Sequence, residues 1–136
     1  MKEGSQLTAD SADDPCDVFN SDCPGREVLN HLTSRWASLI LVALRNGPLR
    51  FHELRGIVGG ISEKMLSQNL RTLVRDGLLS REVLPSVPPS VRYDLTPLGA
   101  DAVVPLIAMV KWVRTNTPTV LAAQQNHDHT TITRRT

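Results

Sequence analysis

The stretch GISEKMLSQNLRTLVRDGLLS, from Gly60 to Ser80, constrains the fold more than any other part of the chain. Its large apolar side chains recur every three or four residues, which predicts a helix with one buried face, formed by Leu66, Leu70, Leu73 and Val74. Ser62 can cap the start of this helix, and Gly77 ends it. The opposite face has no acid along it and carries Lys64, Gln68, Arg71 and Arg75, flanked by Ser67 and Thr72. The chain must therefore bury the leucine face and expose the cationic one.

Two more helices are expected before this stretch. The first spans TSRWASLILVALRNG, residues 33–47, with Thr33 or Ser34 as its N-cap. Its expected core face comprises Trp36, Leu39, Ile40, Ala43 and Leu44. The second spans FHELRGIV, residues 51–58, and no N-cap is evident for it. Its expected core face comprises Phe51, Leu54, Ile57 and Val58. The glycines at 59–60 form a turn, so the pattern predicts a helix-turn-helix.

Two β-prone runs follow, at 78–84 and 91–95, and PSVPPS joins them. The three prolines of this connection exclude a tight two-residue turn, so a short two-stranded hairpin with a stiff tip is expected. Thr96 and Pro97 mark the start of another helix, and Pro105 should kink or restart it. The order of elements predicts a mainly α-helical fold with a small β-hairpin, that is, a winged helix-turn-helix.

Composition divides the chain into three regions. We expect an acidic, disordered arm over residues 1–22, a winged helix-turn-helix domain with a C-terminal dimerisation helix over 23–114, and a disordered tail over 115–136. The net charge is only +1, but residues 1–24 carry six acids and one lysine, whereas residues 35–92 carry nine Lys or Arg and four acids. This asymmetry favours a polyanionic partner.

The sequence predicts neither a membrane partner nor secretion. No apolar run approaches the ~20 residues that span a bilayer. The N-terminus lacks the apolar segment of a secretory signal. A cytoplasmic location is therefore expected, where thiols are normally reduced.

The helix with a cationic face, placed before a hairpin, suits the major groove of B-DNA, which is wide enough to admit a helix. Lys and Arg release counterions from DNA, and Arg and Gln can also pair with base edges. A merely solvated face is the alternative. The missing acids, the preceding short helix and the following hairpin favour DNA binding.

Several segments match a known pattern: Cys23-Pro24, RW at 35–36, LI at 39–40, GPLRFHEL at 47–54, GISEKMLSQNL at 60–70, LVRDGLLSRE at 73–82, VPPSVRYDLTPLG at 87–99, and Trp112. With them the chain resembles the HxlR-type winged helix-turn-helix regulators of bacteria over about residues 23–113. The resemblance implies a dimeric transcription regulator whose helix 62–75 reads the major groove. It also implies that the terminal helix and N-terminal elements form the dimer interface.

The candidate DNA-binding residues are Arg50, Ser62, Lys64, Ser67, Gln68, Arg71, Arg75 and Arg92. Arg50 precedes the short helix, where backbone N–H groups and a basic side chain can hold a phosphate; an exposed loop cation is the alternative. The hairpin departs from the family pattern, because Ser90 stands at a usually basic position and Arg92 at a usually acidic one. Arg92 is a candidate phosphate or minor-groove contact, and an ion pair with Glu82 is an equally good reading.

Cys23 lies just before the first helix, and in some members of the resembled family the matching cysteine senses oxidants or electrophiles. A helix N-terminus favours a thiolate, which could attack a peroxide or quinone, whereas nearby Asp17 and Asp22 disfavour it. A structural thiol is the alternative. Cys16 could be the resolving partner in a Cys16–Cys23 disulfide, and a bridge between subunits is also open.

The sequence thus predicts a homodimeric, sequence-specific regulator of transcription, most readily a repressor, that binds a pseudo-palindromic operator in double-stranded DNA. Oxidation of Cys23 or a small-molecule effector could switch it. A winged-helix module that binds proteins and not DNA is the alternative. We expect no enzymatic activity, cofactor or metal site, because the chain has no Cys-x-x-Cys pair and no Gly-rich phosphate loop.

Overall fold

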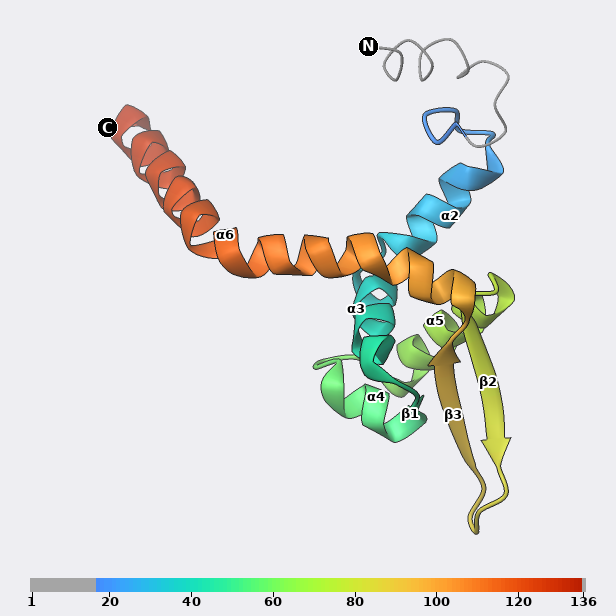
Figure 1. Cartoon of the computed structure of the whole chain (residues 1–136). Helices are drawn as coiled ribbons and strands as arrows, with labels where there is room; N and C mark the ends of the chain where they lie inside the picture. Colours follow the sequence, from blue (N-terminus) through green and yellow to red (C-terminus); the bar gives the residue numbers. More distant parts are fainter. Residues whose placement is uncertain (1–16, 136) are drawn as a thin grey trace. The chain divides into compact units, whose positions relative to one another are not determined.

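The computed structural model describes residues 17–135, with side chains to residue 131, so Cys16 lies outside the described residues. Its elements are α2 (Pro24–Leu32), α3 (Arg35–Ala43), the 3-10 turn η1 (Leu44–Asn46), β1 (Leu49–Arg50), α4 (Phe51–Ile57), α5 (Glu63–Arg75), β2 (Leu79–Leu84), β3 (Ser90–Leu95) and α6 (Pro97–Arg135) (Figure 1). The chain divides into two compact units between Val103 and Val104. The first unit contains the helix-turn-helix and the sheet.

The sheet has three antiparallel strands in the order β1-β3-β2. The sequence predicts only the two-stranded hairpin of β2 and β3, and this expectation was incomplete. Leu49 lies opposite Tyr93, and Arg50 lies opposite Arg92, so β1 adds a third strand. A run of two residues carries no readable periodicity, and β1 is a strand only because β3 pairs with it.

Apolar side chains from the helices and the sheet form the core, and α3, η1, α4 and α5 supply its largest fully buried members. The largest fully buried ones are Ile40, Leu41, Leu44, Leu54, Leu66, Leu70 and Leu73. The buried face predicted for α5 is therefore confirmed at its three leucines, whereas Val74 is half-buried.

The faces predicted for the two preceding helices were partly wrong. Leu39 is 40% exposed while its neighbour Leu41 is fully buried, and Ile57 is 58% exposed. The α3 sequence, RWASLILVA, is apolar on nearly every side, so spacing alone could not choose the buried face.

Side chains cap the helices of the first unit. Ser34 caps α3, because its hydroxyl accepts a hydrogen bond from the Ala37 N–H at 3.3 Å. The sequence shows no N-cap for α4; in the structure the N-cap residue is Arg50, and a side chain of the first helical turn binds its backbone N–H. The Glu53 carboxylate accepts the Arg50 N–H at 2.8 Å.

Helix α6 runs without a break from Pro97 to Arg135, with Pro105 and Pro118 inside it. It does not restart at Pro105. Residues 115–136 were expected to form a disordered tail, whereas α6 includes residues 115–135. The segment 120–125, VLAAQQ, contains good helix formers, which the expectation undervalued. Figure 1 shows α6 bent toward its C-terminal end, as a proline inside a helix can cause.

The start of α6 provides a stability test. A Cβ on Gly99 would lie 2.0 Å from the Leu78 carbonyl oxygen, whereas one on Gly56, inside α4, would meet no atom within 4 Å. We expect Gly99→Ala to destabilise the fold by roughly 1–3 kcal/mol through overpacking. Gly56→Ala should stabilise it by about 0.5–1 kcal/mol by restricting the unfolded chain. Urea unfolding of both variants checks this, and a Gly99→Ala variant at least as stable as the unmodified chain would contradict the packing at Gly99.

Candidate nucleic-acid interface

The N-terminus of α5 is fixed by Ser62. Its hydroxyl accepts the Met65 N–H at 3.1 Å, as the sequence predicts for a helix cap. This hydrogen bond places Ser62 at the exposed entry to α5 and gives the residue a structural role. Its proposed contact with DNA would be in addition to that role.

The cationic stripe of α5 consists of Lys64, Gln68, Arg71 and Arg75. All four residues are exposed, and Ser67 beside them is half-buried. Within the described part of the chain, no ion pair engages Lys64, Arg71 or Arg75. The three charges are therefore available to an external anion.

The one acid at the start of α5 does not interrupt this stripe. Glu63 lies 3.6 Å from the Arg55 guanidinium of α4, measured from Glu63 Oε1 to Arg55 Nη1. This contact offsets its charge and links the two helices of the helix-turn-helix.

Arg92, the predicted hairpin contact, is engaged inside the sheet. It lies opposite Glu82 in the β2–β3 register, and its guanidinium donates a hydrogen bond to the Glu82 carboxylate. The ion pair that the sequence left as an alternative is therefore present. Arg50 lies opposite Arg92 on the other neighbouring strand. These residues share one face of the sheet, because directly opposed side chains point the same way.

Arg50 is exposed at the N-cap position of α4. The Glu53 carboxylate occupies the Arg50 N–H, where the sequence analysis expected a phosphate. The Arg50 side chain remains a candidate contact, but this backbone donor does not.

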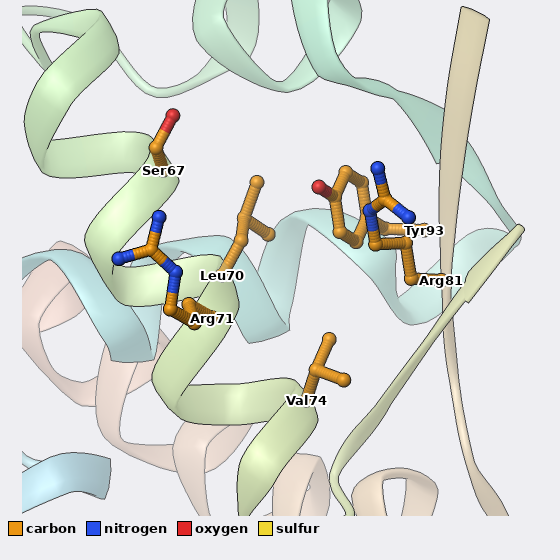
Figure 2. Close-up of a pocket in the computed structure, with 6 residues that line it drawn as sticks. All are labelled: Ser67, Leu70, Arg71, Val74, Arg81 and Tyr93. Atoms are coloured by element: carbon orange, nitrogen blue, oxygen red, sulfur yellow. The ribbon is translucent and has the colours of Figure 1, made fainter. Parts of the chain in front are cut away.

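A pocket of about 390 Å³ lies between α5 and the hairpin of β2 and β3. It is lined by Ser67, Leu70, Arg71, Val74, Arg81 and Tyr93. Figure 2 shows the Arg81 guanidinium beside the Tyr93 ring, and the Arg71 guanidinium extending along α5 toward Ser67.

Arg81 was not among the DNA-binding residues predicted from the sequence. The signal was the alternation along β2, because Leu79 is buried and the residue two positions further on must share its face.

A second missed interaction joins α2 to the end of α5. His31 Nδ1 lies 2.6 Å from Asp76 Oδ2, and Asp76 is the C-cap residue of α5. His31 Nε2 also lies 3.7 Å from Glu27 Oε1, one turn earlier on α2. Because these partners are 45 residues apart in the chain, sequence spacing could not reveal the His31–Asp76 contact.

Cys23 is the N-cap residue of α2, a helix that was not among those predicted from the sequence. Its sulfur accepts the Gly25 N–H at 3.2 Å, and its side chain is 5% exposed. The N-terminal end of the helix dipole favours negative charge at this position. Burial restricts the access of an oxidant to the sulfur.

The part of the chain that the structure describes contains neither a membrane-spanning helix nor a cluster of metal ligands. No helix there is long and apolar enough to cross a bilayer. No group of three or more His, Cys, Asp or Glu side chains there is placed to hold a metal ion.

A helix-turn-helix with α5 exposed beside an antiparallel hairpin defines a winged helix-turn-helix transcription regulator. The sequence profile of the HxlR-like helix-turn-helix family matches residues 31–120, and the chain belongs to this family. It is a family of transcription regulators and not of enzymes.

Proteins similar to this chain are also described as regulators. The HTH-type transcriptional regulator YtfH of Escherichia coli (strain K12) is 52% identical over 107 residues, which are 79% of this chain and 85% of that protein. The structure of the transcriptional regulator ytfH from Salmonella typhimurium is also 52% identical, with a TM-score of 0.76 over 79% of this chain and 96% of that one. The redox regulator HypR in its reduced form is 31% identical, with a TM-score of 0.66 over 73% of this chain and 98% of that one.

The Ser62 cap can be tested by its contribution to stability. Ser62→Ala removes the acceptor for the Met65 N–H and should lower the free energy of unfolding by about 1 kcal/mol. Ser62→Gly should cost only a few tenths of that, roughly 0.3 kcal/mol, because glycine is a fair N-cap. Equal urea-denaturation midpoints for Ser62→Ala and the unmodified chain would show that the cap does not hold α5.

Proposed function

We propose that this regulator binds a pseudo-palindromic operator as a homodimer, with α5 of each copy in the major groove, and represses transcription. The cationic stripe of α5 carries the proposal, because its charges are exposed and unpaired among the described residues. Lys64 and Arg75 supply phosphate contacts and release counterions. Gln68 and Arg71 pair with base edges, because an amide can bind adenine and a guanidinium can bind guanine bidentately.

The second unit supports association with a second copy. Along α6, large apolar side chains are exposed: Val104, Met109, Trp112, Val113, Val120 and Leu121. Exposed apolar side chains of this size along one helix are typical of an interface. A two-fold dimer would present two copies of α5 to half-sites about 34–36 Å apart, or a multiple of that distance.

Repression would follow because the bound dimer excludes RNA polymerase from the promoter. A dimer bound over a promoter occupies the major groove that the polymerase must reach. Control then requires a change in the spacing or direction of the two α5 helices, because the half-sites are fixed by the DNA.

Cys23 is the proposed oxidant sensor. HypR, a structural relative, is described as a redox regulator in both a reduced and an oxidised form. In the proposed reaction, the Cys23 thiolate attacks one oxygen of hydrogen peroxide, the O–O bond breaks, hydroxide leaves, and the sulfur becomes a sulfenic acid. A second thiol, on Cys16 or on the other subunit, would then form a disulfide and release water. Oxidation would disturb the N-cap of α2. Because His31 of α2 contacts Asp76 at the end of α5, a shift of α2 would be passed to the DNA-binding helix.

DNA reading by α5 is tested with a duplex that the protein itself selects from a random library. Fluorescence anisotropy should show binding that weakens steeply with salt. Arg71→Ala should lose about 1–3 kcal/mol of discrimination at one base pair per half-site. Arg114→Ala removes the same charge from α6, outside the cationic stripe, and should keep the base preference. If Arg71→Ala keeps the full base preference, α5 is not the reader; if no duplex binds at any salt, the chain is an interaction module.

The redox proposal is tested with the same duplex. Hydrogen peroxide should lower the affinity of the unmodified protein by a factor within roughly 5–150, the usual range of coupling between two sites, and dithiothreitol should restore it. Cys23→Ser should bind DNA in both conditions without change. An affinity that peroxide leaves unaltered would remove Cys23 as a sensor and leave DNA binding intact.

A further inference from the structure

We propose that Arg81, and not Arg92, is the phosphate contact of the hairpin, and that the pocket between α5 and β2 seats one backbone phosphate of the bound DNA. This inference rests on the proposed function, because it adds a contact to the DNA complex of α5. The phosphate in the pocket would belong to the DNA strand that borders the major groove.

The register of the hairpin places the two arginines on opposite faces. Arg81 lies opposite Tyr93, and Arg92 lies opposite Glu82, one position further along each strand. Side chains alternate between faces along a strand, so Arg81 and Arg92 point away from each other. Tyr93 is 8% exposed and lines the pocket together with Arg81, so the Arg81 face is the one turned toward α5.

The charges on the two faces differ. On the far face, the Arg92 guanidinium is hydrogen-bonded to the Glu82 carboxylate, which offsets its charge. On the near face, no ion pair involves Arg81 or Arg71 within the residues that the structure describes. The pocket therefore carries two uncompensated positive charges and no acid among its lining residues.

The polar groups of the pocket suit a phosphate better than a base edge. The Arg81 guanidinium and the hydroxyls of Ser67 and Tyr93 line the space, and all of them can donate hydrogen bonds (Figure 2). A phosphate offers only acceptors, whereas most base edges mix donors and acceptors. Leu70 and Val74 are the apolar members of the lining.

The pocket lies where a DNA strand at the edge of the major groove would pass. Ser67 and Arg71 belong to both the pocket and the edge of the cationic stripe. With α5 in the major groove, the sugar-phosphate chain at the groove edge must pass beside this flank of the helix, where Arg81 stands. Phosphate contacts of this kind fix the register of a protein on DNA without reading its sequence.

Arg81→Ala tests the contact on the duplex that the unmodified protein selects in vitro. The variant should bind about tenfold more weakly to every sequence, because a charge-assisted hydrogen bond to a phosphate is lost. The slope of log K against log salt should fall in magnitude by about 0.9 per half-site contacted. Arg81→Lys should recover part of the affinity, and Arg92→Ala should lose less than Arg81→Ala. A loss for Arg92→Ala that equals or exceeds that of Arg81→Ala would overturn the proposal.

Uncharged phosphate analogues in the DNA show which phosphate Arg81 contacts. Single methylphosphonate substitutions remove one charge at a time from the same duplex. The unmodified protein should lose affinity at one phosphate per half-site, beside the bases that Arg71 reads, and Arg81→Ala should lose nothing further there. Equal losses for both proteins at every position would mean that Arg81 contacts no phosphate.

The two proposals fail in different ways. If the unmodified protein selects no duplex, DNA binding itself is wrong. If it selects a duplex with a base preference that depends on Arg71, but Arg81→Ala binds as tightly as the unmodified protein, only the phosphate seat is wrong. Circular dichroism of Arg81→Ala should match that of the unmodified chain, because the Arg81 side chain is exposed.

Discussion

The burial of three leucines on one side of α5 determines how this protein presents itself to a partner. Leu66, Leu70 and Leu73 are at most 1% exposed, and each contributes about 1.5–3 kcal/mol by leaving water. Because a helix is rigid, fixing that side also fixes the direction of the opposite one. The cationic stripe is exposed by the packing of the core, and no separate interaction is needed to hold it outward.

The hairpin depends on a second constraint, which is the period of two along a strand. In the register of β2 and β3, the odd position Arg81 faces α5 and the even position Glu82 faces away with Arg92. A slip of β2 by one residue would turn Arg81 away from α5, bring Glu82 to the face beside α5 and separate Glu82 from Arg92. β1 fixes the outer side of β3 through its pairs with Tyr93 and Arg92 and so supports this register.

The sequence was informative where a pattern repeats and uninformative where the chain folds back on itself. Both the buried face of α5 and its exposed stripe follow from a strong helical period. The buried face of α3 was predicted only in part, because Leu39 and Leu41 are equally apolar and only tertiary packing separates them. The roles of Arg81 and of the His31–Asp76 contact depend on residues far apart in the chain, which no local pattern connects.

The central claim is that α5 lies in the major groove of DNA, and purine methylation interference tests it most directly. Methylation of guanine places a group at N7 in the major groove, whereas methylation of adenine at N3 places one in the minor groove. The account predicts that N7 methylation blocks binding at two clusters of guanines about one helical turn, or a multiple of it, apart. Interference confined to adenine N3, with guanine N7 methylation tolerated throughout, would contradict it.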